Sequence, residues 1–296
     1  QGDFSQYIMH AQNLLNGHAY TELNVIPADT INTGGTPPGF PLSIVPILYL
    51  FGVNFIAFKL LIVLFWGSAL YLYWQIVRLY LPRHWALGSV AFLAFTPWVL
   101  KFSNTILGDI PYLAVSLLAV LAVGHFFQSR ITLQNTLFAG LALLLACLFR
   151  NVGVILIGVF LAYAVLFKRS HLIPALLVTL FSYTIVFLLY SAFGCGSSYL
   201  NLFTFDPSEL LIAIQKSFLH IKRAFLKYLA LYPSRQEQSL LYITINHTVL
   251  TVYFSLSILG AVRSLRRRGV TYHDLYIPAY LTVLLIYPYR TPTRYL

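Results

Sequence analysis

Long apolar runs, separated by short polar loops, dominate the hydropathy pattern of this sequence. A helix needs about 20 apolar residues to cross a bilayer, and several runs meet or approach that length. These runs are 54–80, 86–100, 107–127, 172–193, 247–264 and 274–289. Because backbone groups within lipid find no water to pair with, each crossing is expected to be an α-helix.

The run 136–167 does not fit this rule. It is too long for one crossing and short for two, and Arg150-Asn151-Val152-Gly153 interrupts it. We therefore expect two compact helices that meet near Arg150. Counting both, the sequence predicts an all-α, polytopic transmembrane helix bundle of about eight spans.

The composition excludes a soluble globular domain. Hydrophobic residues make up 59% of the chain and charged residues 9%, whereas ordinary soluble domains are about 25% charged. The net charge of +11 at pH 7 could suggest a nucleic-acid partner. The basic residues lie mostly in short loops between apolar runs, however, so membrane topology explains them better. We expect membrane lipids as partners and no nucleic acid.

The distribution of Lys and Arg predicts which loops face the cytoplasm, because cytoplasmic loops carry an excess of both. Residues 1–58 contain neither, whereas Arg263 and Arg266 to Arg268 form a cluster at the end of a span. We place this cluster in the cytoplasm and let successive loops alternate between the two sides of the membrane, which puts the loops 1–53 and 194–246 outside the cytoplasm. We expect short interfacial helices in these two loops. The residues that this arrangement brings to one outer face are Asp3, Asp109, Arg290 and Arg294.

The first outer loop opens on a candidate catalytic carboxylate. The spacing of Tyr7 and Ala11 predicts a short amphipathic helix that begins near Asp3 and ends near Gly17. Gln6 follows Asp3 at the spacing of a capping box. The Asp3 carboxylate therefore either caps this helix or serves catalysis at the membrane interface, and both roles are compatible because a cap orients the carboxylate.

A proline-rich segment, Pro37-Pro38-Gly39-Phe40-Pro41, follows in the same loop. Its prolines stiffen the chain, and Gly39 allows a tight turn. The apolar stretch that continues to Gly52 is too short to cross a membrane. We expect it to form an interfacial helix that lies flat at the outer surface.

Asp109 is the only one of the eight acids that is pressed directly against a long apolar run. Carboxylates at such a depth are costly and mark functional sites. Asp109 would also suit the N-cap of a helix that has Pro111 in its first turn, so both interpretations stay open. Lys101, in the same short outer loop, is a plausible ion-pair partner.

Three arginines are candidates for binding an anionic group. Arg150 either extends its side chain to the surface without a further role or binds an anion at the outer end of its hairpin. Arg290 and Arg294 lie four residues apart just outside a span, which suits a phosphate or diphosphate. Interfacial anchoring is the alternative for this pair.

The candidate residues occur in a characteristic order along the chain. They are Asp3 with Tyr7, Ala11, Leu14 and Gly17; Pro37-Pro38-Gly39-Phe40-Pro41; Asp109-Ile110-Pro111; and Arg294-Tyr295-Leu296. This set resembles the membrane glycosyltransferases of the GT-C fold, in the branch of the protein O-mannosyltransferases, the lipid A aminoarabinose transferases and their bacterial relatives. The resemblance implies one GT-C-like transmembrane module over 1–296, a fragment whose first span and C-terminal part are missing.

The resemblance also implies roles for individual residues. Asp3 and Asp109 would be catalytic, with Tyr7 and Pro38 in support. The residues expected to bind a lipid phosphate are Arg294, Arg290, Arg150 and Lys101. Some relatives bind a divalent metal ion near such acids, but this chain has no Asp-x-Asp pair, so the metal site is unknown and no other cofactor is indicated.

The implied activity is transfer of a sugar from a polyprenyl-phosphate carrier to a lipid, glycan or protein acceptor. A single base opposite the leaving group predicts inversion, and the family acts at the outer face of the bacterial inner membrane. The alternative is a transporter or flippase for lipid-linked or anionic solutes. Transporters tend to place charges near the bilayer midplane, whereas the ionisable residues here lie mostly at the ends of spans.

Overall fold

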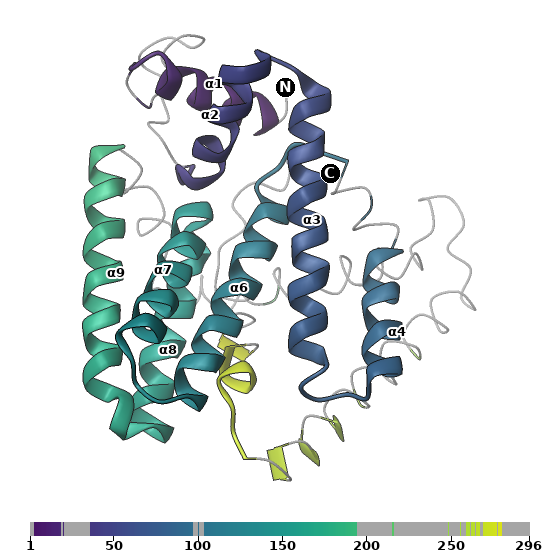
Figure 1. The fold of residues 1–296 in the computed structure, drawn as a ribbon, viewed down its shortest axis with the longest axis vertical. Helices are drawn as coiled ribbons and strands as arrows, with labels where there is room; N and C mark the ends of the chain where they lie inside the picture. The colour runs from purple at the N-terminus through teal and green to yellow at the C-terminus, as the bar shows by residue number, and fades with distance from the viewer. Residues whose placement is uncertain are drawn as a thin grey trace. The chain divides into compact units, whose positions relative to one another are not determined.

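A computed structural model describes residues 3–18, 20, 36–96, 100 and 104–193, and isolated residues between 215 and 279, of which 269–276 is the longest run. The chain divides into two compact units, Gln1–Phe95 with Leu100–Leu202, and Thr96–Val99 with Phe203–Leu296. The helices labelled in Figure 1 all belong to the first unit.

Every described element of regular structure is a helix, and these residues contain no strand. The α-helices are α1 (Asp3–Leu15), α2 (Gly39–Phe51), α3 (Phe55–Val77), α4 (Arg83–Ala94), α6 (Asp109–Gln128), α7 (Leu133–Phe149), α8 (Val154–Phe167) and α9 (Leu172–Ala192). Short 3-10 helices, Asn151–Gly153 and Arg169–His171, lead into α8 and α9. The prediction of an all-α fold is confirmed for the described part of the chain.

Three helical segments of that part are long and apolar enough to cross a membrane. They are Phe55–Val77, Asp109–Gln128 and Arg169–Ala192, and the shorter apolar helices are Gly39–Phe51, Leu133–Phe149 and Asn151–Phe167. The expected spans 247–264 and 274–289 and the loop 194–246 lie largely outside the described residues. A helical protein compatible with a membrane is therefore established, and the count of about eight spans stays a prediction.

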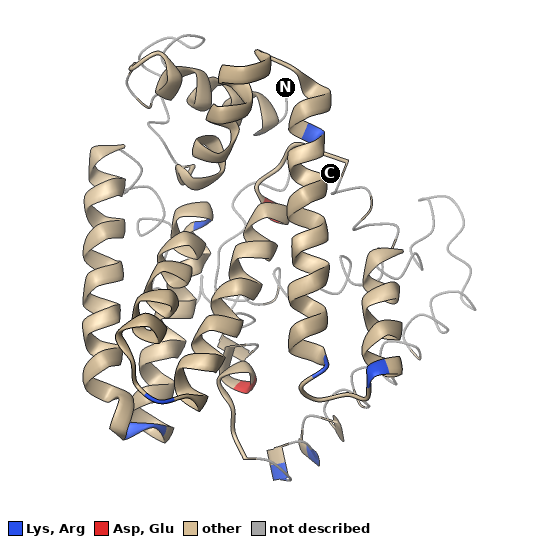
Figure 2. Ribbon diagram, viewed as in Figure 1, with Lys and Arg blue, Asp and Glu red and all other residues tan. Residues whose placement is uncertain are grey.

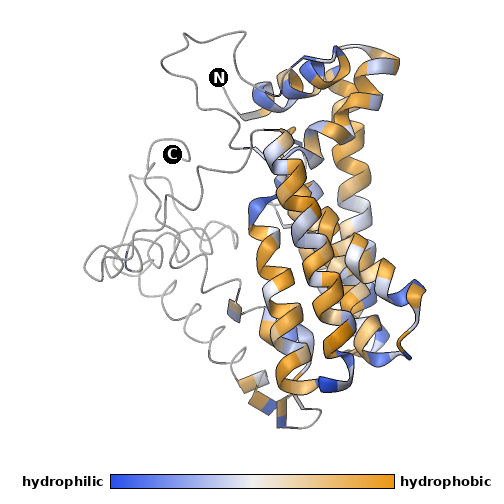
Figure 3. Cartoon of the chain, turned by 90° about the vertical axis from the view of Figure 1, so that its left-hand side faces the viewer, coloured by the Kyte–Doolittle hydropathy of each residue, from blue (hydrophilic) through white to orange (hydrophobic). Residues whose placement is uncertain are grey.

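The outer helices α3 and α9 are apolar on nearly all sides. Only 22% of the apolar window is buried in each, against 72% in α6. Figure 3, in which α9 faces the viewer, shows mostly hydrophobic residues along this helix. A helix that exposes aliphatic and aromatic side chains all round suits lipid rather than water. The central helix is α6, which packs against α3 on one side and α7 on the other.

Hydrogen bonds and ring contacts between helices show the directions of the helices. The Tyr190 hydroxyl donates to the carbonyl of Cys147 at 2.6 Å, and that of Ser182 donates to the carbonyl of Gly140 at 3.3 Å, so α9 runs parallel to α7. Phe126, near the C-terminus of α6, contacts Phe160 on α8. The short connection after α6 reverses the chain, so the N-terminus of α6 and the C-terminus of α7 lie at the same end (Figure 1).

The predicted pair of compact helices is confirmed. α7 ends at Phe149, Arg150 is its C-cap, and α8 begins at Val154. A Cβ atom on Gly153 would lie 2.5 Å from the carbonyl carbon of Ala146, so glycine permits this close turn. With 17 and 14 residues, α7 and α8 are roughly 25 and 21 Å long, which is less than the ~30 Å hydrocarbon core.

The predicted span 86–100 is wrong as a continuous helix. α4 has 12 residues and ends at Ala94, and Phe95 is its C-cap. Thr96 precedes Pro97 in the sequence, and a proline disfavours the helical conformation of the residue before it. The apolar run only approaches the length of a span, and the proline divides it.

Basic residues gather at the end of the unit away from the α6 N-terminus (Figure 2). They occupy the C-cap of α3, the start of α4 and the connections that follow α6 and α8: Arg78, Arg83, Arg130, Lys168 and Arg169. The guanidinium of Arg78 lies over the Trp74 ring, 4.9 Å from its centroid. This arrangement agrees with the alternation expected from the sequence.

Candidate functional site

The α6 N-terminus and the α7 C-terminus carry an ion pair of two residues that lie 41 positions apart in the sequence. Arg150 Nη1 donates to Asp109 Oδ1. Asp109 is the first residue of α6, and Arg150 is the C-cap of α7. A carboxylate is stabilised at a helix N-terminus and a cation at a C-terminus, so each charge also suits its own helix. The side chains are 41% and 42% exposed, so a ligand can reach them.

The structure excludes one of the two interpretations of Asp109 that the sequence left open. Asp109 is not the N-cap of α6; Gly108 holds that position, and no side chain caps it. The proposed partner Lys101 lies outside the described residues, and the partner in the structure is Arg150. Sequence reasoning missed the pairing because no local spacing connects the two residues.

Tyr7 and Pro38, the two supporting residues, lie at the same end of the unit. The Tyr7 ring meets the Phe40 ring edge to face, with centroids 4.9 Å apart. A Cβ atom on Gly108 would lie 3.3 Å from the Tyr7 hydroxyl oxygen, so Tyr7 is in contact with the residue that precedes Asp109. Pro38 is buried at the N-cap of α2. Helices α1 and α2 thus cover the α6 N-terminus.

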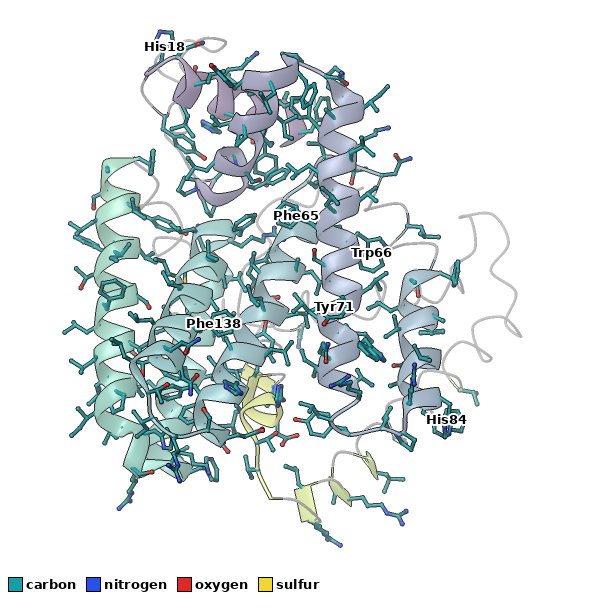
Figure 4. The ribbon with its side chains drawn as sticks, viewed as in Figure 1. His18, Phe65, Trp66, Tyr71, His84 and Phe138 are labelled. Atoms are coloured by element: carbon teal, nitrogen blue, oxygen red, sulfur yellow. The ribbon has the colours of Figure 1, made fainter. Side chains whose placement is uncertain are left out.

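Gly39 has a different role from the tight turn predicted for it. It is the first residue of α2, where a Cβ atom would lie 2.7 Å from the carbonyl carbon and oxygen of Leu148 and 2.8 Å from Phe149 Cδ2. Glycine is therefore required because two helices approach closely. The contact holds α2 against the last residues of α7, directly before Arg150. Figure 4 shows the side chains of this region, including Phe65 of α3, whose ring centroid lies 5.7 Å from that of Phe149.

Asp3 is the first residue of α1, one helical turn before Tyr7. Its backbone therefore lies in the helix that packs against Gly108, and its side chain lies outside the described part. Arg290 and Arg294 are also outside the described residues. Of the predicted site residues, the structure brings together Tyr7, Asp109 and Arg150, with Pro38 beside them on α2.

His10 is a feature that sequence reasoning did not single out. It is fully buried on α1 and stacks on Tyr20, with ring centroids 4.1 Å apart and planes inclined by 18°. Burial lowers the pKa of His10 from 6.5 to about 4, because a charged imidazole would lose its hydration there. The Tyr20 hydroxyl donates to the Thr36 carbonyl at 3.1 Å. His10 thereby helps to hold α1 against the chain that leads into α2.

The described residues do not form a metal centre. Among the described residues, no group of three or more His, Cys, Asp or Glu side chains could hold a metal ion. Cys147 is buried on α7 as a free thiol. The described residues therefore do not change the sequence-based expectation about a divalent metal ion.

The chain matches no protein family model, no curated protein and no solved structure. The fold itself therefore defines the class, which is a helical protein with at least three helices long and apolar enough to cross a membrane. Its distinguishing feature in the described residues is the Asp109–Arg150 pair at one end of these helices, under the α1–α2 layer.

Proposed function

We propose that this chain is a membrane glycosyltransferase module of the GT-C type. It moves a sugar from a polyprenyl-phosphate carrier to an acceptor on the extracytoplasmic side of the membrane, in bacteria that of the inner membrane. The observation that supports the proposal most directly is the meeting of Asp109 and Arg150 at the helix end that is covered by α1, the helix that begins with Asp3.

The proposed chemistry uses these residues in distinct roles. The acceptor hydroxyl gives its proton to Asp3 as its oxygen bonds to the anomeric carbon, while the bond from that carbon to the lipid phosphate breaks. Arg150 neutralises the charge that develops on the leaving phosphate, with Arg290, Arg294 and Lys101 as further candidates. Asp109 orients the sugar. Attack opposite the leaving group inverts the anomeric carbon.

The test is transfer of a radiolabelled sugar from a polyprenyl-phosphate carrier by the purified full-length protein. We expect Asp3→Asn and Arg150→Gln to lower kcat by at least about 100-fold, the usual scale for a general base or a charge-stabilising donor. Arg130→Gln is the matched control, because Arg130 lies past the other end of α6, about 30 Å away. Near-normal transfer by Asp3→Asn would remove Asp3 from the catalytic role.

A transporter or flippase for lipid-linked or anionic solutes is the competing function. Two short apolar helices that meet at an arginine resemble the broken helices of transporters. Arg150, however, lies level with the first residue of α6, at the end of a helix long enough to span. Uptake of an anionic solute into vesicles without any sugar transfer would favour the transporter.

A further inference from the structure

The proposed function assigns the Arg150 guanidinium to the lipid phosphate, but this guanidinium forms an ion pair with Asp109. Arg150 Nη1 donates to the Asp109 carboxylate in the structure. A phosphate that binds Arg150 must therefore compete with Asp109 for the guanidinium. The following inference rests on the proposed function and concerns how its site is opened.

The two charges can separate without either being left in an apolar environment. About two fifths of each side chain is exposed, so water can solvate both charges after separation. Asp109 remains at the N-terminus of α6 and Arg150 at the C-terminus of α7, where the helix dipoles favour their charges. Ion pairs of this exposure correspond to roughly a two- to fivefold effect on an equilibrium constant. The pair is thus weak enough to be exchanged by a ligand.

The phosphate of an isoprenyl phosphate can replace the carboxylate on Arg150. The sugar-carrying donor is a phosphodiester with one negative charge, the lipid phosphate that remains after transfer carries up to two, and in both the oxygens match the planar guanidinium in a two-point contact. An isoprenyl chain adds apolar surface that remains in the membrane beside the exposed faces of the bundle. An isoprenyl phosphate therefore has both the headgroup and the location to take Arg150 from Asp109.

We propose that the Asp109–Arg150 pair is a latch that an isoprenyl phosphate opens on binding, by exchanging the Asp109 carboxylate for its phosphate on Arg150. The exchange releases Asp109 beside the bound headgroup, where the carboxylate accepts hydrogen bonds from hydroxyls of the sugar. Arg150 and Asp109 thus become available to the donor together. The latch prevents Arg150 from holding other anions when the donor is absent.

The latch predicts that removal of the Asp109 charge raises the affinity of the protein for an isoprenyl phosphate. Asp109→Asn keeps the shape of the side chain and removes its charge, so the Asp109 carboxylate no longer competes with the ligand for Arg150. Farnesyl phosphate should then bind about two- to fivefold more tightly than to the unmodified protein, although sugar transfer is lost. The gain should vanish when Asp109→Asn is combined with Arg150→Ala, because only Arg150 transmits it.

The experiment measures binding of farnesyl phosphate to the full-length protein in nanodiscs by titration calorimetry, with farnesol as the ligand that lacks the phosphate. Arg150→Gln replaces Arg150→Ala if the alanine variant does not fold, and Arg130→Gln is the matched arginine control. Tighter binding of farnesyl phosphate by Asp109→Asn, lost in the double variant and not seen with farnesol, supports the latch.

Three results would overturn it. The first is unchanged or weaker binding of farnesyl phosphate by Asp109→Asn. The second is a gain that persists in the double variant, because Asp109 would then act on the ligand by charge repulsion alone. In both cases the proposed function survives. The third result is no binding of farnesyl phosphate by the unmodified protein, which removes the proposed function together with the latch.

Discussion

Replacing Gly39 with alanine tests whether α2 holds the site together. The added Cβ atom would lie 2.7 Å from the carbonyl carbon and oxygen of Leu148, and 2.8 Å from Phe149 Cδ2. Carbon atoms in normal contact are about 3.5–4.0 Å apart, so α2 must retreat by roughly 1 Å. Most of these contacts are with backbone, which cannot move aside as a flexible side chain can.

The expected magnitude is a balance of two effects. Forcing an extra methyl group into a tight contact costs about 1–3 kcal/mol. Alanine in place of glycine in a helix returns at most about 1 kcal/mol. Gly39→Ala should therefore lower the free energy of unfolding by about 1–2 kcal/mol. It should also lower sugar transfer, because Phe40 would shift relative to Tyr7.

The matched control is Gly158→Ala on α8, where a Cβ atom would meet nothing within 4 Å. This variant gains helix propensity without a clash and should raise the free energy of unfolding by about 0.5–1 kcal/mol. Unfolding of both variants is followed by circular dichroism during titration with SDS in mixed micelles. Equal effects of the two substitutions, or stabilisation by Gly39→Ala, would refute the close contact between α2 and α7.

Two further predictions concern single side chains. His10→Phe keeps the ring stacked on Tyr20 but cannot take up a proton. In the unmodified protein the unfolded state binds a proton near pH 6.5 and the folded state only near pH 4, so stability falls as the pH drops from 6.5 to 4, by up to about 3 kcal/mol. Unfolding titrations at pH 7 and pH 4 should show a smaller loss for His10→Phe, and parallel losses would contradict the burial of a neutral His10. Tyr190→Phe removes the hydroxyl that donates to the Cys147 carbonyl and should cost about 1 kcal/mol. Tyr183→Phe, at an exposed position on α9, should cost close to nothing in the same titration, and equal costs would show that the Tyr190 hydrogen bond does not stabilise the bundle.

The helices of this protein could be predicted largely from local pattern. Long apolar runs predicted α3, α6 and α9, because a helix in lipid needs little beyond length and apolarity. The break at Arg150 was visible for the same reason, since a run with a charged interruption cannot form one span. The failure at 86–100 came from Pro97, whose effect on Thr96 outweighs the hydropathy of the run.

The candidate site was predictable only in part. The location of Asp109 at the start of a helix followed from Pro111 and the apolar run, but its partner Arg150 depends on how α6 and α7 fold together. Gly39 could be recognised as significant from its neighbours Pro38 and Phe40, yet its contact with α7 is tertiary and leaves no local pattern. The burial of His10 likewise arises from the return of the chain near Tyr20.

We propose that the Asp109–Arg150 end faces the extracytoplasmic side of the membrane. Labelling of single cysteines with a membrane-impermeant maleimide in intact cells tests it directly, in a full-length protein in which Cys147 and Cys195 are replaced by serine. Asn16→Cys lies directly after α1, at the end of the unit that carries Asp109 and Arg150. Ser170→Cys lies between α8 and α9, at the opposite end where the basic residues gather. Both positions are exposed. We expect Asn16→Cys to be labelled in intact cells and Ser170→Cys to react only after the membrane is opened. The opposite pattern would place the Asp109–Arg150 end on the cytoplasmic side and refute the proposed orientation.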